Sequence, residues 1–136
     1  MSTHNLDENV AEIRTVIERW ALSVQRCDID GVLAGHGSGV VMFDVPPPEN
    51  GVRGLEAYAS AWPAFFEWVQ SGARFDIDEL HVDAGADVAF AWALLRCGTD
   101  DALRFDPDRR LRLSFGLRRR AGSWEILHEH HSFAHP

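Results

Sequence analysis

The hydrophobic pattern of this chain changes at Gly72. Before that glycine, apolar side chains recur every three or four residues, as they do along one face of a helix. After it, apolar and polar side chains mostly alternate, as they do along a strand. Helices followed by a run of long antiparallel strands predict an α+β domain in which a curved sheet closes over the helices. Such a half-barrel encloses a pocket between its sheet and its helices.

Two helices are expected at the start of the chain. The first begins near Asn5 or Asp7 and carries an apolar stripe at helical spacing, made of Val10, Ile13, Val16, Ile17, Trp20, Ala21 and Val24. Asp28 can cap a second, short helix, which Gly35 and Gly37 then end.

One strand and a further helical pattern follow before Gly72. Residues 40–45 form an apolar run that the rigid prolines 46–48 end, so they predict a strand and a loop. Residues 55–69 again place apolar side chains on one helix face, and Pro63 either kinks this helix or divides it in two.

Four segments after Gly72 are expected to be strands, namely residues 73–85, 87–98, 109–120 and 124–132. In the first, Phe75 and Ile77 are in one phase and Leu80 and Val82 in the other, which predicts a bulge or bend in mid-strand. The charged and turn-rich residues 99–110 predict a hairpin loop between the second and third strands.

Length and composition limit the class of protein. The 136 residues are expected to form a single domain, residues 1–136. A net charge of -8, with no basic run longer than residues 118–120, argues against nucleic acid as a partner. No signal peptide or apolar run of about 20 residues is found, and Cys27 and Cys97 lack the spacing of metal ligands. We therefore expect a cytoplasmic protein with no membrane partner, metal or cofactor.

Aromatic residues are numerous, with five tryptophans and eight phenylalanines. Seven come from different predicted elements yet all lie on apolar faces, namely Trp20, Trp62, Phe65, Phe66, Phe90, Trp92 and Phe115. They either fill the core or line a cavity that binds a small hydrophobic molecule. Under the second interpretation, the candidate substrate-binding residues are Trp20, Trp62, Phe66, Phe90, Trp92 and Phe115.

The order helix, short helix, strand, helix and long strands resembles the nuclear transport factor 2-like superfamily over essentially the whole chain. The most specific similarities are WALSVQRCDIDGVLAGHGSGVVMFD (residues 20–44), RGLEAYASAW (53–62) and GSWEILHEHHS (122–132). The last is similar to the tail of kinase association (hub) domains and of small uncharacterised bacterial SnoaL-like proteins. The resemblance implies a cone-shaped, cystatin-like α+β fold with an internal pocket, as in ketosteroid isomerase, polyketide cyclases and scytalone dehydratase.

The resemblance to ketosteroid isomerase can be followed residue by residue. That enzyme has a catalytic aspartate at the end of its first strand, before a proline-containing loop, and Asp44 in MFDVPPP matches it. Its oxyanion-hole tyrosine is replaced by Trp20, whose indole donates one hydrogen bond but cannot act as a phenol. The position of its protonated acid falls near Ser114. The resemblance thus implies a base at Asp44 without the familiar oxyanion hole.

Asp44 has two interpretations. A carboxylate beside an aromatic pocket is poorly solvated, which makes it a stronger base and suits it to proton abstraction. Alternatively, Asp44 caps the proline loop by accepting backbone N–H bonds, as aspartates commonly do at turns.

The histidine-rich tail divides by strand parity, because alternate side chains leave opposite faces of a strand. One set consists of Trp124, Ile126, His128 and His130, and the other of Glu125, Leu127, Glu129 and His131. His128 and His130 are close enough to share a metal ion with His81 as a third ligand. Hub domains also have histidine at both positions and are not metalloenzymes, which favours a packing role on the sheet.

Glu129 and His131 are expected to enter the same pocket as Asp44 if Leu127 marks the cavity side, as the corresponding face does in ketosteroid isomerase. A glutamate and a histidine there can divide the acid and base work. The alternatives are that this face is partly solvated, or that Glu129 pairs with an arginine, either Arg96 or Arg112. The candidate catalytic residues are therefore Asp44, His131, Glu129 and His128.

These inferences favour a cofactor-independent isomerase, dehydratase or cyclase that moves protons on a hydrophobic carbonyl compound. The competing hypothesis is a non-catalytic ligand-binding or oligomerisation module like the hub domains. Outer sheet faces of this superfamily often pack against another subunit. A homodimer is therefore expected through two sets of outward side chains on neighbouring strands, the small set (Ala89, Ala91, Ala93) and the polar set (Arg112, Ser114, Gly116, Arg118). The alternative is that this face is solvated.

Overall fold

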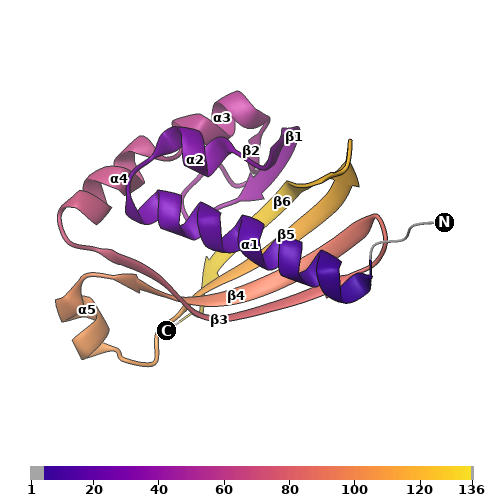
Figure 1. Cartoon of the computed structure of the whole chain (residues 1–136). Helices are drawn as coiled ribbons and strands as arrows, with labels where there is room; N and C mark the ends of the chain where they lie inside the picture. Colours follow the sequence, from indigo (N-terminus) through magenta and orange to yellow (C-terminus); the bar gives the residue numbers. More distant parts are fainter. Residues whose placement is uncertain (1–4, 136) are drawn as a thin grey trace.

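The computed structural model describes residues 5–135, so residues 1–4 and 136 of the expected single domain lie outside the described residues. The elements are α1 (Leu6–Gln25), α2 (Ile29–Leu33), β1 (His36–Phe43), β2 (Val52–Arg53), α3 (Leu55–Ser60), α4 (Pro63–Gln70), β3 (Arg74–Ala84), β4 (Val88–Gly98), α5 (Asp100–Phe105), β5 (Leu111–Arg120) and β6 (Ser123–Phe133). The strands form one sheet in the order β2-β1-β6-β5-β4-β3. Helices α1–α4 cover one face of this curved, open sheet (Figure 1), which confirms the predicted α+β class.

One strand pairing departs from the predicted antiparallel sheet. β1 runs parallel to β6, whereas the other neighbouring strands are antiparallel. In the register of this parallel pair, Met42 lies opposite Glu129 and Phe43 opposite His130. The mixed sheet therefore brings the residue after β1, Asp44, next to the end of β6.

Helix boundaries follow the capping residues in the sequence. Asn5 caps α1 by accepting a hydrogen bond from the backbone N–H of Asp7, and Asp28 caps α2. Pro63 is the first residue of α4, so it divides the helical region instead of kinking it. Residues 99–110 are more than a loop, because they contain α5, which Thr99 caps. None of the helices within residues 5–135 has the length and apolar character needed to cross a membrane.

A bulge in β3 lies between Ile77 and Glu79, where the change of parity predicts it. Phe75 before the bulge and Leu80 after it are both buried, although they are in opposite phases of the sequence. The extra residue reverses parity and keeps both apolar segments on the core side.

A second bulge, in β6, was not predicted. Leu127 is an extra residue against β5, and it reverses the phase of the strand. The buried side chains of β6 before and after it are Trp124, Ile126, Glu129 and His131. The prediction that His128 and His130 share a face with Trp124 is therefore wrong, since His128 and His130 lie on the outer face.

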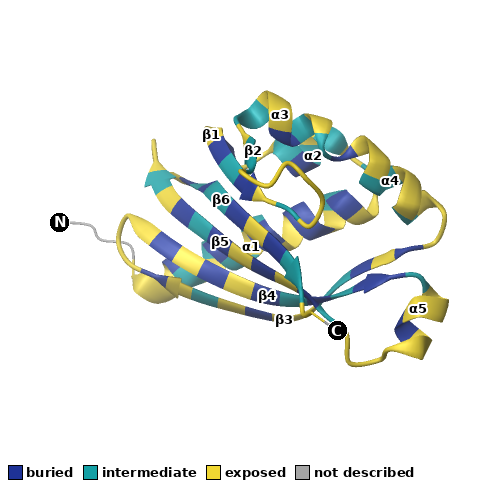
Figure 2. Cartoon of the chain, turned by 180° about the vertical axis from the view of Figure 1, so that it is seen from behind, coloured by how far each residue is buried: buried dark blue, intermediate teal, exposed yellow. Residues whose placement is uncertain are grey.

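In β4 the large side chains that were expected to face the core face outward, and the small ones face the core. Phe90 and Trp92 are 56% and 39% exposed, and burial alternates along the strand when the sheet is seen from behind (Figure 2). The buried phase is instead Ala89, Ala91 and Ala93. Phe115 lies opposite Ala91 on β5 and packs edge-on against Trp20 of α1, so large rings from the neighbouring elements fill the space above the alanines. The alanines therefore cannot form an outer dimer face.

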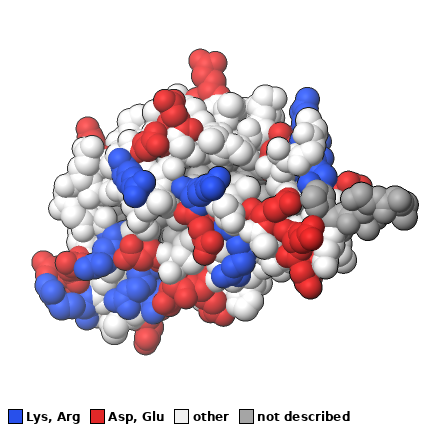
Figure 3. Space-filling model, viewed as in Figure 1, with Lys and Arg blue, Asp and Glu red and all other residues white. Residues whose placement is uncertain are grey.

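Charged side chains of both signs are interspersed on the face that carries α1 (Figure 3). Among the described residues on that face, the arginines form no continuous basic track of the kind that a phosphate backbone follows.

Candidate functional site

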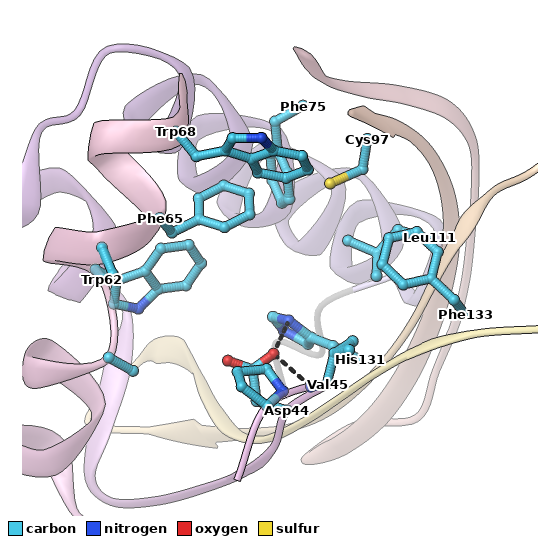
Figure 4. Close-up of a pocket in the computed structure, with 13 residues that line it drawn as sticks. Asp44, Val45, Trp62, Phe65, Trp68, Phe75, Cys97, Leu111, His131 and Phe133 are labelled. Atoms are coloured by element: carbon cyan, nitrogen blue, oxygen red, sulfur yellow. Dashed lines mark hydrogen bonds and ion pairs between the residues drawn. The ribbon is translucent and has the colours of Figure 1, made fainter. Parts of the chain in front are cut away.

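A cavity of about 330 Å³ lies between α4 and the inner face of the sheet (Figure 4). The side chains of Asp44 and His131 lie together at one end of it. Its apolar walls are formed chiefly by Trp62, Phe65, Trp68, Phe75, Leu111 and Phe133. The site therefore combines one small polar end with an apolar chamber of the size that binds small molecules.

Six aromatic residues were predicted to bind substrate. Among the described residues that line the cavity, Trp62 is the only one of these six. Three of them pack behind the wall, namely Trp20, Phe66 and Phe115. The prediction for Phe90 and Trp92 is wrong, because the phase of β4 points both rings to the outer face.

Sequence reasoning did not assign most of the other wall residues to the site, among them Trp68, Cys97 and Phe133. Phe133 follows the phase of β6 that the bulge sets, so its position becomes evident only when the bulge is known. Cys97 points its thiol into the cavity (Figure 4), and burial raises the pKa of this thiol to about 12. Cys97 is therefore an uncharged wall group at neutral pH.

Asp44 combines both of the roles considered for it. Its Oδ1 accepts a hydrogen bond of 2.8 Å from the backbone N–H of Val45, as a loop cap does. The same oxygen lies 3.5 Å from Nδ1 of His131, and the side chain lines the cavity with 23% of its surface exposed. Within residues 5–135, Oδ2 has no hydrogen-bond donor. This oxygen is therefore available to a bound molecule.

His131 is held between two carboxylates. Its Nε2 donates to Oε1 of Glu129 at 2.8 Å, and its Nδ1 faces Asp44. Burial alone would lower the pKa of this imidazole, but its interactions with Asp44 and Glu129 outweigh burial and raise that pKa to about 9. His131 is therefore an imidazolium at neutral pH, with one N–H directed at the polar end of the cavity.

Glu129 is fully buried and is satisfied by three donors. Besides His131, the hydroxyl of Tyr58 donates to its Oε2 at 2.8 Å, and Nε2 of His36 donates to the same oxygen. Burial would raise the pKa of this carboxyl, but its hydrogen bonds and electrostatic interactions with His131 and His36 lower it to about 2. Glu129 is thus a stable anion, which explains how a carboxylate is tolerated with no exposed surface. Neither Arg96 nor Arg112 pairs with it.

Tyr58 and His36 were not predicted as site residues. Tyr58 is the only tyrosine of the chain. Its place on the apolar stripe of a helix was the only feature of the sequence that could have indicated a buried phenol. Its hydroxyl accepts a hydrogen bond from the indole N–H of Trp20 at 3.0 Å. Burial and the charge of Glu129 raise the pKa of this phenol well above its usual range. The site therefore contains a phenol, but it comes from α3 and not from the position of Trp20 on α1.

The histidines of the outer face do not join this site. Nδ1 of His128 donates to the backbone carbonyl of Val41 at 2.7 Å, and its ring packs edge-on against Phe43. The prediction of a catalytic His128 is therefore wrong. His81 stacks on Trp92 of β4, and β4 and β5 separate its strand from β6. Among residues 5–135, no three or more His, Cys, Asp or Glu side chains are placed so that they could hold one metal ion.

The buried ion pair predicts how stability depends on pH. The pKa of His131 rises from 6.5 to about 9 on folding, so its contribution is complete below about pH 6.5 and is lost as the pH rises through 9. The pKa of Glu129 falls from 4.5 to about 2, so its contribution is complete above about pH 4.5 and is lost as the pH falls through 2. Urea unfolding should show maximal stability near pH 4.5–6.5 and a loss of about 3 kcal/mol between pH 6.5 and 9.5. Constant stability over that alkaline range would contradict a charged His131.

Comparison with known proteins gives a family and a fold. The sequence model of the SnoaL-like domain family matches residues 13–136. An NTF2-like protein of unknown function from Pseudomonas putida KT2440 is 33% identical, with a TM-score of 0.80 over 93% of this chain and 87% of its own. No protein with a curated description matches the chain.

Two more distant structures share the fold alone. A candidate ketosteroid isomerase from Shewanella frigidimarina is 19% identical, with a TM-score of 0.71 over 87% of this chain and 92% of its own. A candidate dehydratase of the NTF2-like family from Streptomyces avermitilis is 12% identical, with a TM-score of 0.74 over 97% of this chain and 100% of its own.

Proposed function

Because this chain belongs to the SnoaL-like domain family, we propose that it catalyses proton transfer on a small hydrophobic carbonyl compound without a cofactor. The observation that carries the proposal is the pairing of Asp44 with His131 at the polar end of an apolar cavity. Isomerisation, dehydration and cyclisation all begin with such a transfer. The names of two proteins with the same fold, a candidate isomerase and a candidate dehydratase, fall in these classes.

The mechanism assigns one role to each polar group. Oδ2 of Asp44 removes a proton from the carbon beside the carbonyl, and the C–H electron pair forms a carbon–carbon double bond. The carbonyl π electrons move to its oxygen, which takes the proton from Nδ1 of His131. The distance from Nδ1 to Asp44 Oδ1 is 3.5 Å, longer than an ordinary hydrogen bond, so a substrate oxygen can compete for this proton. The proton on Asp44 then moves to a different carbon of the conjugated enol, and the enol oxygen returns its proton to His131, which restores the carbonyl and completes an isomerisation.

Deuterium exchange tests this function without knowledge of the natural substrate. The purified protein is incubated in D₂O with bicyclic ketones that fit the cavity, such as 2-tetralone, and deuterium at the carbon beside the carbonyl is followed by NMR. We expect exchange well above the rate in buffer and above that with denatured protein. Ketones that bind, as judged by quenching of tryptophan fluorescence, but never exchange would contradict catalysis and support the non-catalytic ligand-binding module.

We also propose that the protein is a homodimer through the outer face of its sheet. Val88, Phe90 and Trp92 form an exposed apolar strip along β4, with exposures of 67%, 56% and 39%. Outward acids lie on β3 (Glu79, Asp83) and outward arginines on β5 (Arg112, Arg118), on opposite sides of the strip. A twofold axis over the strip would bring the acids of one copy to the arginines of the other.

Replacing Trp92 with glutamate should convert this dimer to a monomer, because it places a charge in the centre of the apolar strip. Sedimentation velocity measures the mass, and circular dichroism checks that the fold is retained. Phe105→Glu is the matched control, since Phe105 on α5 is 93% exposed and lies outside the strip. A wild-type protein that is monomeric at all concentrations would contradict the proposed interface.

We further propose a reducing, cytoplasmic location. Cys27 and Cys97 are both free thiols in the structure, and Cys97 is buried. Unpaired thiols are usual where the environment keeps them reduced.

A further inference from the structure

The two oxygens of Glu129 serve different partners. Oε1 accepts a hydrogen bond from His131 alone, on the side of the cavity. Oε2 accepts from Tyr58 and from His36, on the side away from the cavity. The rings of His36 and Tyr58 pack against each other with centroids 4.6 Å apart and their planes inclined by 31°. These two donors thus form a unit that occupies one oxygen of the carboxylate.

A hydrogen bond to one oxygen of a carboxylate withdraws negative charge from the other. Donors at Oε2 therefore weaken the attraction of Oε1 for the proton on His131. The ionisable groups that face His131 come from three elements: Asp44 after β1, Glu129 on β6 and, beyond it, Tyr58 on α3 and His36 on β1. Cys97 on β4 shares the cavity as a neutral thiol. Of the groups behind Glu129, only His36 and Tyr58 donate to it among the described residues.

The buried imidazole of His36 has an unsatisfied nitrogen, which lowers the stability of the fold. Its side chain has no exposed surface, and its Nδ1 has no hydrogen-bond partner within residues 5–135. A buried polar atom left unsatisfied destabilises the folded protein, because it loses its hydrogen bond to water on folding. A phenylalanine would fill nearly the same space beside Tyr58 without that cost. The imidazole is therefore better explained by what its Nε2 does to Glu129.

We propose that His36 is a positioning residue which, together with Tyr58, occupies the second oxygen of Glu129 and so keeps the proton of His131 available for transfer. The consequence for catalysis rests on the proposed function, because it assigns His131 as the proton donor to the substrate oxygen. The effect on His131 itself does not depend on any reaction.

His36→Phe tests the proposal, since it keeps an aromatic ring beside Tyr58 and removes the donor to Glu129. The titration of His131 is followed by NMR with labelled imidazole nitrogens. We expect its midpoint to move to higher pH by about one unit, a tenfold change in proton affinity. Tyr58→Phe, which removes only a hydroxyl from the same oxygen, should move the midpoint in the same direction and provides a second measurement if His36→Phe does not fold.

His130→Phe is the matched control, because His130 lies exposed on the outer face of β6, where its ring packs edge-on against Phe43. It should leave the midpoint of His131 unchanged. A midpoint that stays constant or falls in both His36→Phe and Tyr58→Phe overturns the proposal, even if the protein catalyses exchange. A midpoint that rises in a protein without any turnover supports it and rejects the proposed function instead. If exchange occurs, the alkaline limb of its pH profile should move with the midpoint.

Discussion

Asp44→Asn should lower the rate of ketone deuterium exchange by about 10²–10⁴-fold, the range that a well-placed general base contributes. The amide oxygen of asparagine can still accept the hydrogen bond from Val45, so the loop after β1 should keep its shape. The amide cannot take up a proton from carbon. Ketone affinity, measured by fluorescence quenching, should therefore change little while exchange is lost.

Asp108→Asn provides the control for this experiment. It makes the same chemical change at an exposed carboxylate that is not part of the cavity wall. Exchange in Asp108→Asn should equal that of the wild type. If Asp44→Asn retained full exchange, Asp44 would be only the cap of the proline loop, and another base would have to be sought.

Local rules predicted those parts of the fold that depend on neighbouring residues. The caps Asn5 and Asp28 act within a single turn, so their effect can be inferred from a few residues. The bulge in β3 was predictable because apolar residues on both sides of it change phase within the same strand. The bulge at Leu127 left no such mark, since the residues that take the inward phase after it are polar, Glu129 and His131.

Glu129 and His131 were expected at the cavity from the phase of Leu127. Both face inward, but only His131 lines the cavity, while Glu129 is fully buried, and the inward phase has another cause than the one assumed. Leu127 is itself the bulged residue, so the strand reaches the inner phase by a change of parity. Phe90 and Trp92 show the opposite error. Large apolar residues were taken to face inward, but the rings on neighbouring elements leave room only for the alanines of β4.

The buried network could not be inferred from local sequence, because its members are far apart in the chain. His36 and Glu129 are separated by 93 residues, and Tyr58 and Glu129 by 71. Their meeting depends on the register of the parallel pair formed by β1 and β6 and on how α3 packs across it. A histidine at the start of a strand and a tyrosine on an apolar helix face carry no individual sign of this contact.

Glu129→Gln should be the most destabilising single change in the site, with a loss of about 3–5 kcal/mol in the free energy of unfolding. Glu129 accepts three hydrogen bonds through two oxygens, whereas glutamine has one oxygen and one NH₂ group. At least one donor would then face another donor, and the His131 imidazolium would lose its buried counter-ion. Urea unfolding near pH 6 measures the loss. Glu125→Gln on the same strand, where the carboxylate is partly exposed, should cost about 1 kcal/mol or less.

The double variant Glu129→Leu with His131→Phe distinguishes a stabilising role of the ion pair from a catalytic one. Replacing a buried ion pair with apolar side chains is often neutral or favourable, because neither charge then has to be removed from water. The hydroxyl of Tyr58 and Nε2 of His36 would lose their acceptor, so recovery should be partial, with about 1–3 kcal/mol still missing per unsatisfied donor. We expect the double variant to be more stable than Glu129→Leu alone, which leaves the His131 imidazolium buried without a counter-ion, and to catalyse no exchange. A double variant no more stable than Glu129→Leu would contradict a charged His131.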